Sequence, residues 1–377
     1  MIAQRYADFG PELAREYLAR EHGYAHSTET LRGWMIQAGL WQPKLRRAPR
    51  VHPARERRAC RGELVQIDGS HHAWFEQRAA KCCLIAFIDD ATGQVLAARF
   101  SATETTQAYF AVLQEQVLRH GAPLALYSDR HGIFTKHDPE DARPTQFERA
   151  LLQLRIEPIC AHSPQAKGRV ERLFQTLQDR LVKALRLAGI DDMDAANAWL
   201  PAYVEQHNER FGVPAREPAD AHRPWPGSGA ELQRICCLHH QRQLSTQLSC
   251  SFEGHIVQLH ADQPHAPSGR ALIDIAQHAN GEIELFYRGQ PLAFSRYGVH
   301  ERRPDKLVHA KQLNARVQPL ADAEHKRLAR LRAQIEHQDA QRANGIYTPA
   351  EVSNAPPRVA AGRYGLRPSQ PAATHLA

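Results

Sequence analysis

Between residues 64 and 160, short apolar runs alternate with helical stretches in an order that few folds accommodate. Five runs have the length and composition of β-strands: 64–67, 82–88, 95–100, 124–127 and 156–160. Helical stretches at 105–120 and 145–154 separate the last of these runs, and a turn at 91–93 joins the second and third as a hairpin. This order predicts an α/β fold, in which a mixed five-stranded sheet carries helices on its faces.

A long amphipathic helix is expected at 167–188, directly after the fifth run. Its apolar side chains form one continuous stripe: Val170, Leu173, Phe174, Leu177, Leu181 and Leu185. Glu171 lies at the edge of that stripe, and Lys167, Gln175 and Gln178 form a polar line beside it. A second helix is expected at 193–211, and a Pro- and Gly-rich stretch at 214–229 marks a boundary.

Three acidic residues occupy positions that can converge in such a fold. Asp68 follows the first strand, Asp129 follows the fourth, and Glu171 is on the helix after the fifth. Three carboxylates repel one another unless a cation lies among them, and hard divalent cations take oxygen ligands. Two such ions about 3.5–4 Å apart support phosphoryl transfer. Asp89 and Asp90 are alternative candidates for metal-binding acids, but they lie toward the turn after the second strand, so we rank them lower.

The segments that hold these acids resemble a known family. LVQIDGSHHAWF, ALYSDRHGIF and SPQAKGRVERLFQTLQDRL look like the three catalytic blocks of DDE transposases and retroviral-type integrases. The likeness is closest to the ISNCY group of bacterial insertion-sequence transposases, whose core commonly ends in a segment similar to HNERFGVPAREPADAHRP at 207–224. It covers roughly residues 1–300 and is strongest from 62 to 224.

The resemblance implies an RNase H-like core at 62–224, with Asp68, Asp129 and Glu171 as catalytic metal ligands. The implied metal is Mg²⁺, for which Mn²⁺ substitutes. Lys167, Arg169 and Arg172 would contact DNA near the reacting phosphate. The implied activity cuts double-stranded DNA at transposon ends and joins the freed 3′-hydroxyl to target DNA. Because two ends must be held together, a homo-oligomer is expected.

The excess positive charge is concentrated in one segment. The chain carries a formal charge of +7, and residues 44–61 hold eight basic residues and one acid. With Pro49 and Pro53, this segment is typical of an extended arm along a polyanion, most simply DNA. The arm residues expected to contact DNA are Arg46, Arg47, Arg57 and Arg58. A solvated linker is the alternative.

Two short helices precede the arm. Residues 11–22 and a stretch capped by Ser27 or Thr28 have helical apolar spacing, and Gly23 separates them. We expect a helix-turn-helix at 1–43, with Thr30 and Arg32 as groove contacts, although an ordinary helical hairpin has the same pattern. The family usually carries a further helix-turn-helix, so the chain is expected to open within the second one.

The C-terminal part is predicted to hold a small β-barrel at 240–300, a helix at 313–345 and a disordered tail at 353–377. Between the catalytic blocks, an acidic, Pro-bearing insertion at 137–144 is expected to be a surface loop.

The seven cysteines indicate free thiols in a reducing cytoplasm, because their number is odd and no CxxC occurs. His71, His72, Cys82 and Cys83 superficially suggest a zinc site. Neighbouring residues of a strand face opposite sides, however, so we do not expect the four to share one ion. No signal peptide is visible, and no apolar run is long enough to cross a membrane.

Two other functions remain open from the sequence. A copy without catalysis would bind transposon ends and keep the fold. An RNase H-like nuclease would keep the acids and need neither the basic arm nor the barrel. The sequence favours the transposase, since the acids, the arm and the C-terminal strands occur together.

Overall fold

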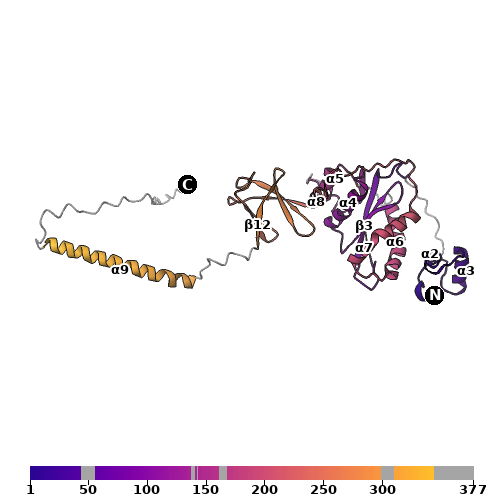
Figure 1. Cartoon of the computed structure of the whole chain (residues 1–377), viewed down its shortest axis with the longest axis horizontal. Coiled ribbons are helices and arrows are strands. Elements are labelled where there is room, and N and C mark those ends of the chain that lie inside the picture. The colour runs from indigo at the N-terminus through magenta and orange to yellow at the C-terminus, as the bar shows by residue number, and fades with distance from the viewer. Residues whose placement is uncertain (44–55, 137–140, 142, 161–167, 299–309, 344–377) are drawn as a thin grey trace, which may run out of the picture. The chain divides into compact units, whose positions relative to one another are not determined.

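The computed structural model describes residues 1–43, 56–136, 141, 143–160, 168–298 and 310–343. The chain divides into two compact units, Met1–Gly298 and Val299–Ala377, and each is described by itself (Figure 1). Lys167, Arg46 and Arg47, predicted as DNA contacts, lie outside the described residues, as do most of the insertion and the tail. None of the helices in the described part combines the length and the apolar character that crossing a bilayer requires.

The centre of the first unit is the mixed five-stranded sheet that the sequence predicts. Its strands are β1 (Leu64–His72), β2 (Cys82–Asp89), β3 (Val95–Ser101), β4 (Ala125–Ser128) and β5 (Glu157–Cys160). They lie in the order β3-β2-β1-β4-β5. β2 and β3 are antiparallel to their neighbours, whereas β1, β4 and β5 run parallel. The parallel pairs need crossovers, which the helices supply.

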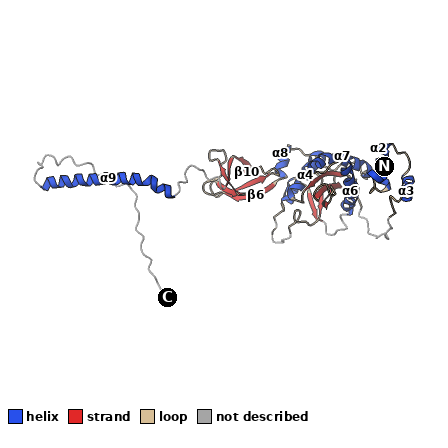
Figure 2. Ribbon diagram, turned by 90° about the horizontal axis from the view of Figure 1, so that it is seen from below, coloured by secondary structure: helices blue, strands red, loops and turns tan. Residues whose placement is uncertain are grey.

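Helices cover both faces of this sheet (Figure 2). They are α4 (Thr106–His120), α5 (Gln146–Gln153), α6 (Gly168–Leu187) and α7 (Met193–Phe211). Val65 and Ile67 pack with α4 and α5 in one core, while Leu84 and Ala86 pack with α6 and α7 in another. Because successive side chains of a strand alternate, Gln66, Asp68 and Ser70 point to the face that carries α6 and α7.

Strand β3 is an edge strand, and two asparagines of α7 occupy its free backbone groups. Asn197 accepts a hydrogen bond from the Phe100 amide (2.7 Å) and donates one to the Phe100 carbonyl (3.0 Å). Asn208 does the same for Val95, at 2.8 and 2.7 Å. An amide side chain can both accept and donate, so each asparagine replaces part of a neighbouring strand.

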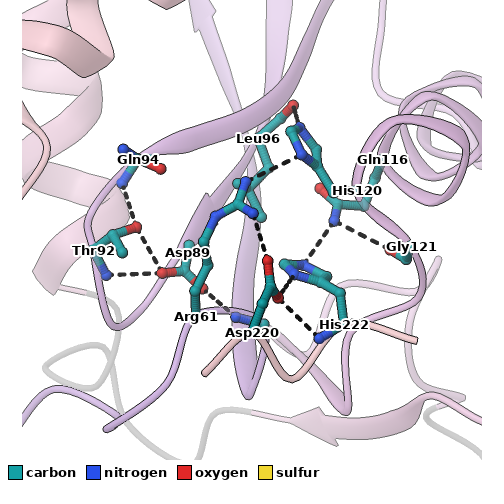
Figure 3. Close-up of polar contacts among 11 residues, drawn as sticks. Arg61, Asp89, Thr92, Gln94, Leu96, Gln116, His120, Gly121, Asp220 and His222 are labelled. Atoms are coloured by element: carbon teal, nitrogen blue, oxygen red, sulfur yellow. Dashed lines mark hydrogen bonds and ion pairs between the residues drawn. The ribbon is translucent and has the colours of Figure 1, made fainter. Parts of the chain in front are cut away.

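The segment after α7 returns along the sheet and is fixed by a polar network (Figure 3). Arg61 contacts Asp220 (2.7 Å) and His120 (3.1 Å), and Asp220 contacts the buried His222 ring (2.6 Å). The other ring nitrogen of His222 lies 3.1 Å from the side-chain amide of Gln116 in α4. The 207–224 motif is therefore a structural clasp, which joins the start of β1 to α4.

The N-terminal helices are α1 (Ile2–Arg5), α2 (Pro11–His22) and α3 (Thr28–Gln37). Gly23 ends α2 in the left-handed conformation with φ of 66°, and the Ser27 side chain caps α3 by accepting from the Thr30 amide. Both ends agree with the sequence prediction.

The remaining elements of the first unit are α8 (Gly229–Ile235) and seven strands. The strands are β6 (Leu238–Gln243), β7 (Ser249–Phe252), β8 (His255–Leu259), β9 (Leu272–Gln277), β10 (Ile283–Tyr287), β11 (Gln290–Leu292) and β12 (Phe294–Gly298). They form a four-stranded sheet, β11-β10-β9-β6, and a three-stranded sheet, β12-β8-β7, around one apolar cluster. Closure of these sheets into the predicted barrel stays a prediction.

The second unit contains α9 (Ala310–Ala343), which begins before and ends close to the predicted helix. Two other differences from the sequence prediction stand out. The first strand continues past Asp68 to His72, because pairing with β2 continues to the His72–Cys82 pair. The short helix α8 lies just beyond the predicted boundary, where Ser228 and Glu231 form a capping box.

Candidate active site

Asp68 lies within β1, and Asp129 directly follows β4, the parallel neighbour of β1. The register pairs Val65 with Leu126 and Gln66 with Tyr127, and its continuation by two residues would bring Asp68 beside Asp129. Paired strands are about 4.8 Å apart, a spacing at which two carboxylates can share a ligand. Both residues are partly buried.

Two contacts fix how α6 lies along β1. At its start, Arg169 reaches Asp90, which also accepts a hydrogen bond from the Gln66 side chain (2.7 Å). Further along, the Gln178 amide donates to the Ser70 hydroxyl (3.1 Å). Glu171 lies between these two points on the helix, and Asp68 lies between Gln66 and Ser70 on the strand. The helix therefore carries Glu171, which is exposed, over the stretch of β1 that holds Asp68.

The competing acids are used by the fold. Asp89, fully buried, accepts hydrogen bonds from the Gly62 amide (2.9 Å) and from both the amide and the hydroxyl of Thr92 (2.8 and 2.7 Å; Figure 3). Asp90, also fully buried, accepts from the Arg58 amide (2.9 Å) and pairs with Arg169 at 2.5 Å. Since Asp89 pairs with Val65, both acids lie toward the start of β1 and away from Asp68.

The described basic residues predicted to contact DNA have different environments. Arg169 and Arg57 are engaged with the protein: Arg169 pairs with Asp90, and Arg57 donates to the backbone carbonyls of Asp90 and Ala91. Arg172 is exposed on the next turn of α6, and it lines a cleft together with Arg57 and Arg169. Sequence reasoning gave all these arginines one role and missed the buried partner that two of them share.

Arg32 and Arg58, the other described members of that set, have local contacts. The Arg32 side chain pairs with Glu29 one turn earlier in α3, and its guanidinium lies 5.9 Å from the Trp41 ring. The backbone amide of Arg58 binds Asp90 at the end of the basic arm. These contacts leave the predicted groove and phosphate contacts as predictions.

Comparison with known proteins identifies the family. A protein of Sinorhizobium fredii that carries the name transposase y4bF is 41% identical over 362 residues, which are 95% of this chain and 76% of that protein. The chain belongs to the transposases. A transposase for insertion sequence IS1202 of Streptococcus pneumoniae is 43% identical over 168 residues, which are 43% of this chain and 36% of its own length. No model in the scan of protein families matches the chain.

Solved structures have low similarity to the chain. A chain of the simian T-cell lymphotropic virus intasome is 16% identical, with a TM-score of 0.34 over 75% of this chain and 92% of its own. The HTLV-2 integrase catalytic core domain, solved in complex with magnesium, is 18% identical, with a TM-score of 0.31 over 44% of this chain and 100% of its own. These scores are too low to carry an argument.

As an insertion-sequence transposase of the DDE type, the chain is a polynucleotidyl transferase. Its five-stranded mixed sheet with helices on both faces is the α/β core that the sequence predicts. The family assignment rests on sequence identity over nearly the whole chain.

Proposed function

We propose that this transposase cleaves DNA at transposon ends and joins the freed 3′-hydroxyl to target DNA, with Asp68, Asp129 and Glu171 as its catalytic acids. The observation that carries this assignment is the register of β1 and β4. Its continuation by two residues would bring Asp68 beside Asp129, which directly follows β4, and α6 lies along the same face of β1; this supports the proposal. Asp89 and Asp90 are less suited, because both are fully buried and lie toward the start of β1.

The donor set suits Mg²⁺, with Mn²⁺ as a substitute. Hard divalent cations prefer carboxylate oxygens, and the three acids supply such oxygens with no sulfur or imidazole among them. Bound there, the metal would lower the energy of charge that develops on the phosphate during transfer. Partial burial of Asp68 and Asp129 strengthens their electrostatic interactions by limiting the water around them.

The chain's own residues position the acids and the DNA. Asp68 lies in β1, Asp129 directly follows β4, and the Gln178–Ser70 contact holds α6 against β1. Arg172, exposed and one residue after Glu171, is placed to bind a DNA phosphate, and we propose the same for Lys167. Arg169 instead positions the start of α6 through Asp90.

Affinity for double-stranded DNA is proposed to come from other parts of the chain. These are a helix-turn-helix within residues 1–43, the basic arm at 44–61 and a barrel at 240–300. We also propose that the protein acts as a homo-oligomer, since strand transfer by this family needs two ends in one complex.

The test measures joining of a labelled transposon-end duplex to plasmid DNA in Mg²⁺ or Mn²⁺. Asp68→Asn, Asp129→Asn and Glu171→Gln should each abolish joining and leave binding of the end nearly unchanged. The double and triple variants should lose little more, since the three act as one unit. Asp191→Asn, at an exposed acid between α6 and α7, is the control and should join normally.

Two outcomes would favour the alternatives. If the unaltered protein binds ends and never joins them, it is a DNA-binding copy without catalysis. If it releases cut strands and transfers none, it is an RNase H-like nuclease. Joining that survives Glu171→Gln and disappears in Asp90→Asn would mean that the acids have been wrongly assigned.

A further inference from the structure

A second group of ligating side chains lies on the other face of the sheet from Asp68. His71 of β1 and Cys83 of β2 are directly opposite each other in the antiparallel pairing, and they share the face that α4 covers. Glu104, in the connection from β3 to α4, lies beside His71 and Cys83. One ligand atom from each of the three, Nε2 or Nδ1 of His71, Sγ of Cys83 and a carboxylate oxygen of Glu104, lies within 4.8 Å of the others.

The distances are close to those of a tetrahedral metal site. The Oε1 atom of Glu104 is 3.6 Å from Cys83 Sγ and 3.9 Å from His71 Nε2. Around tetrahedral zinc, with Zn–S of about 2.3 Å and Zn–N and Zn–O of about 2.1 Å, the corresponding separations are about 3.6 and about 3.4 Å. The His71 side chain is 54% exposed, so a small rotation of its ring can close the remaining gap.

The surroundings hold Glu104 in place for this contact. A Cβ atom at Gly69 would lie 2.5 Å from the Glu104 carboxyl group and 2.9 Å from Cys83 Sγ, so only glycine lets the carboxyl group approach the strand. The Tyr109 hydroxyl donates a hydrogen bond to the other carboxylate oxygen, Oε2, at 3.1 Å. One oxygen of Glu104 is thus oriented by tyrosine, and the other faces His71 and Cys83. Hydrogen bonds of this kind orient metal ligands in known sites.

We propose that His71, Cys83 and Glu104 bind one Zn²⁺ ion, with the fourth position open to water at the exposed His71 side. Imidazole nitrogen, thiolate sulfur and carboxylate oxygen form a mixed set that suits zinc and does not suit Mg²⁺, which prefers oxygen. The site differs from that proposed for the three acids, because His71 and Cys83 lie on the face that α4 covers, whereas strand alternation places Asp68 on the other face of β1.

Binding of Zn²⁺ at this site would release one proton, that of the Cys83 thiol. Without metal, the Cys83 thiol donates to Glu104, and burial together with the Glu104 charge raises the pKa of that thiol. Binding of Zn²⁺ replaces the thiol proton, which is released to solvent, by a sulfur–metal bond. The affinity should therefore increase with pH.

The chain supplies a matched control for each strand residue. His72 and Cys82 are neighbours of the ligands and also form a cross-strand pair, but they face the opposite side of the sheet. Cys82 packs with α6 and α7, and the His72 ring lies 5.3 Å from the Trp74 ring. Replacing His72 or Cys82 removes the same type of side chain as replacing His71 or Cys83, but it leaves the proposed ligands intact.

The experiment titrates the full chain, freed of metal with a chelator, with Co²⁺ in excess Mg²⁺. Cobalt bound to a thiolate gives a sulfur-to-metal charge-transfer band, which carboxylate sites do not produce. The band should saturate at one ion per chain, and Zn²⁺ should displace it. It should be lost in Cys83→Ala, strongly weakened in His71→Ala, and unchanged in Cys82→Ala and His72→Ala.

Two gentler variants keep the test decisive if a cysteine variant does not fold. Tyr109→Phe keeps the ring and removes only the hydroxyl, so the affinity for Co²⁺ should fall by about 10- to 100-fold. Gly69→Ala should displace Glu104 and weaken binding at least as much, with the far-ultraviolet circular dichroism unchanged. Absence of the band in the unaltered protein, or its equal loss in Cys82→Ala, would overturn the proposal.

Discussion

Replacement of Arg169 by alanine distinguishes a structural role from a DNA contact. The guanidinium is 17% exposed and pairs at 2.5 Å with Asp90, whose side chain is fully buried. Removal of one partner from a buried ion pair costs about 3–5 kcal/mol. The low end applies here, because the Gln66 side chain and the Arg58 amide still donate to Asp90. We therefore expect Arg169→Ala to lower the free energy of unfolding by about 3 kcal/mol.

Urea and thermal unfolding of the full chain measure this loss. For a domain of 150–250 residues, 1 kcal/mol corresponds to about 2–4 °C in Tm, so the transition of the catalytic core should fall by about 6–12 °C. In a double-mutant cycle, Arg169→Ala should lower the free energy of unfolding much less in the Asp90→Asn background, since the buried charge is then absent. The salt dependence of DNA binding should not change.

Arg172→Ala is the matched control, since Arg172 is exposed on the same helix. It should leave Tm within about 2 °C, in line with a surface change of less than 0.5 kcal/mol. It should also reduce the slope of log affinity against log salt by about 0.9, the value for one phosphate contact. If Arg169→Ala flattens the salt slope and leaves Tm unchanged, the ion pair does not have the role assigned to it.

Three further predictions concern other parts of the chain. Burial lowers the pKa of His207 from 6.5 to about 4, so the unfolded chain binds more protons than the folded chain between these pH values. The free energy of unfolding should therefore fall by about 3 kcal/mol as the pH drops from 6.5 to 4. His207→Gln should flatten this pH dependence in urea titrations. Asn197→Ala and Asn208→Ala each leave two backbone groups of β3 without their partner and should cost about 1–3 kcal/mol in the same assay, additively; no measurable loss would show that water replaces the side chains. Arg46→Gln with Arg47→Gln should flatten the salt slope of DNA binding by about 1.8, and an unchanged slope would make the arm a plain linker.

Local sequence patterns account for much of the fold. The bounds of α2 and α7 agree with the prediction, because Gly23 and Asp192 provide the local terminal structures and the apolar periodicity between the helix ends is regular. Four of the five predicted strands also lie within one residue of their observed bounds. By contrast, β1 continues through Gly69–His72, where polar residues show no alternation and only the pairing with β2 maintains the strand.

Contacts between segments that are distant in the sequence could not be predicted from local sequence patterns. The pair of Arg169 and Asp90 joins residues 79 apart, and nothing in either local pattern indicates that the arginine has a buried partner. The group of His71, Cys83 and Glu104 depends on the register of two strands and on the path of the β3–α4 connection. The alternation rule correctly separated His71 from His72 and Cys82 from Cys83, but it could not supply Glu104.

The two asparagines along β3 also affect whether the sheets of two copies of this protein can pair edge to edge. An uncovered edge strand is a template on which another chain can add a strand, and such growth is open-ended. Several transposase molecules bound close together on one DNA molecule would be at high local concentration, where that growth is fastest. Asn197 and Asn208 already bind the amide and carbonyl groups of Phe100 and Val95, at two positions where an incoming strand could pair. With these positions occupied, copies that lie close together are less able to join their sheets along this edge.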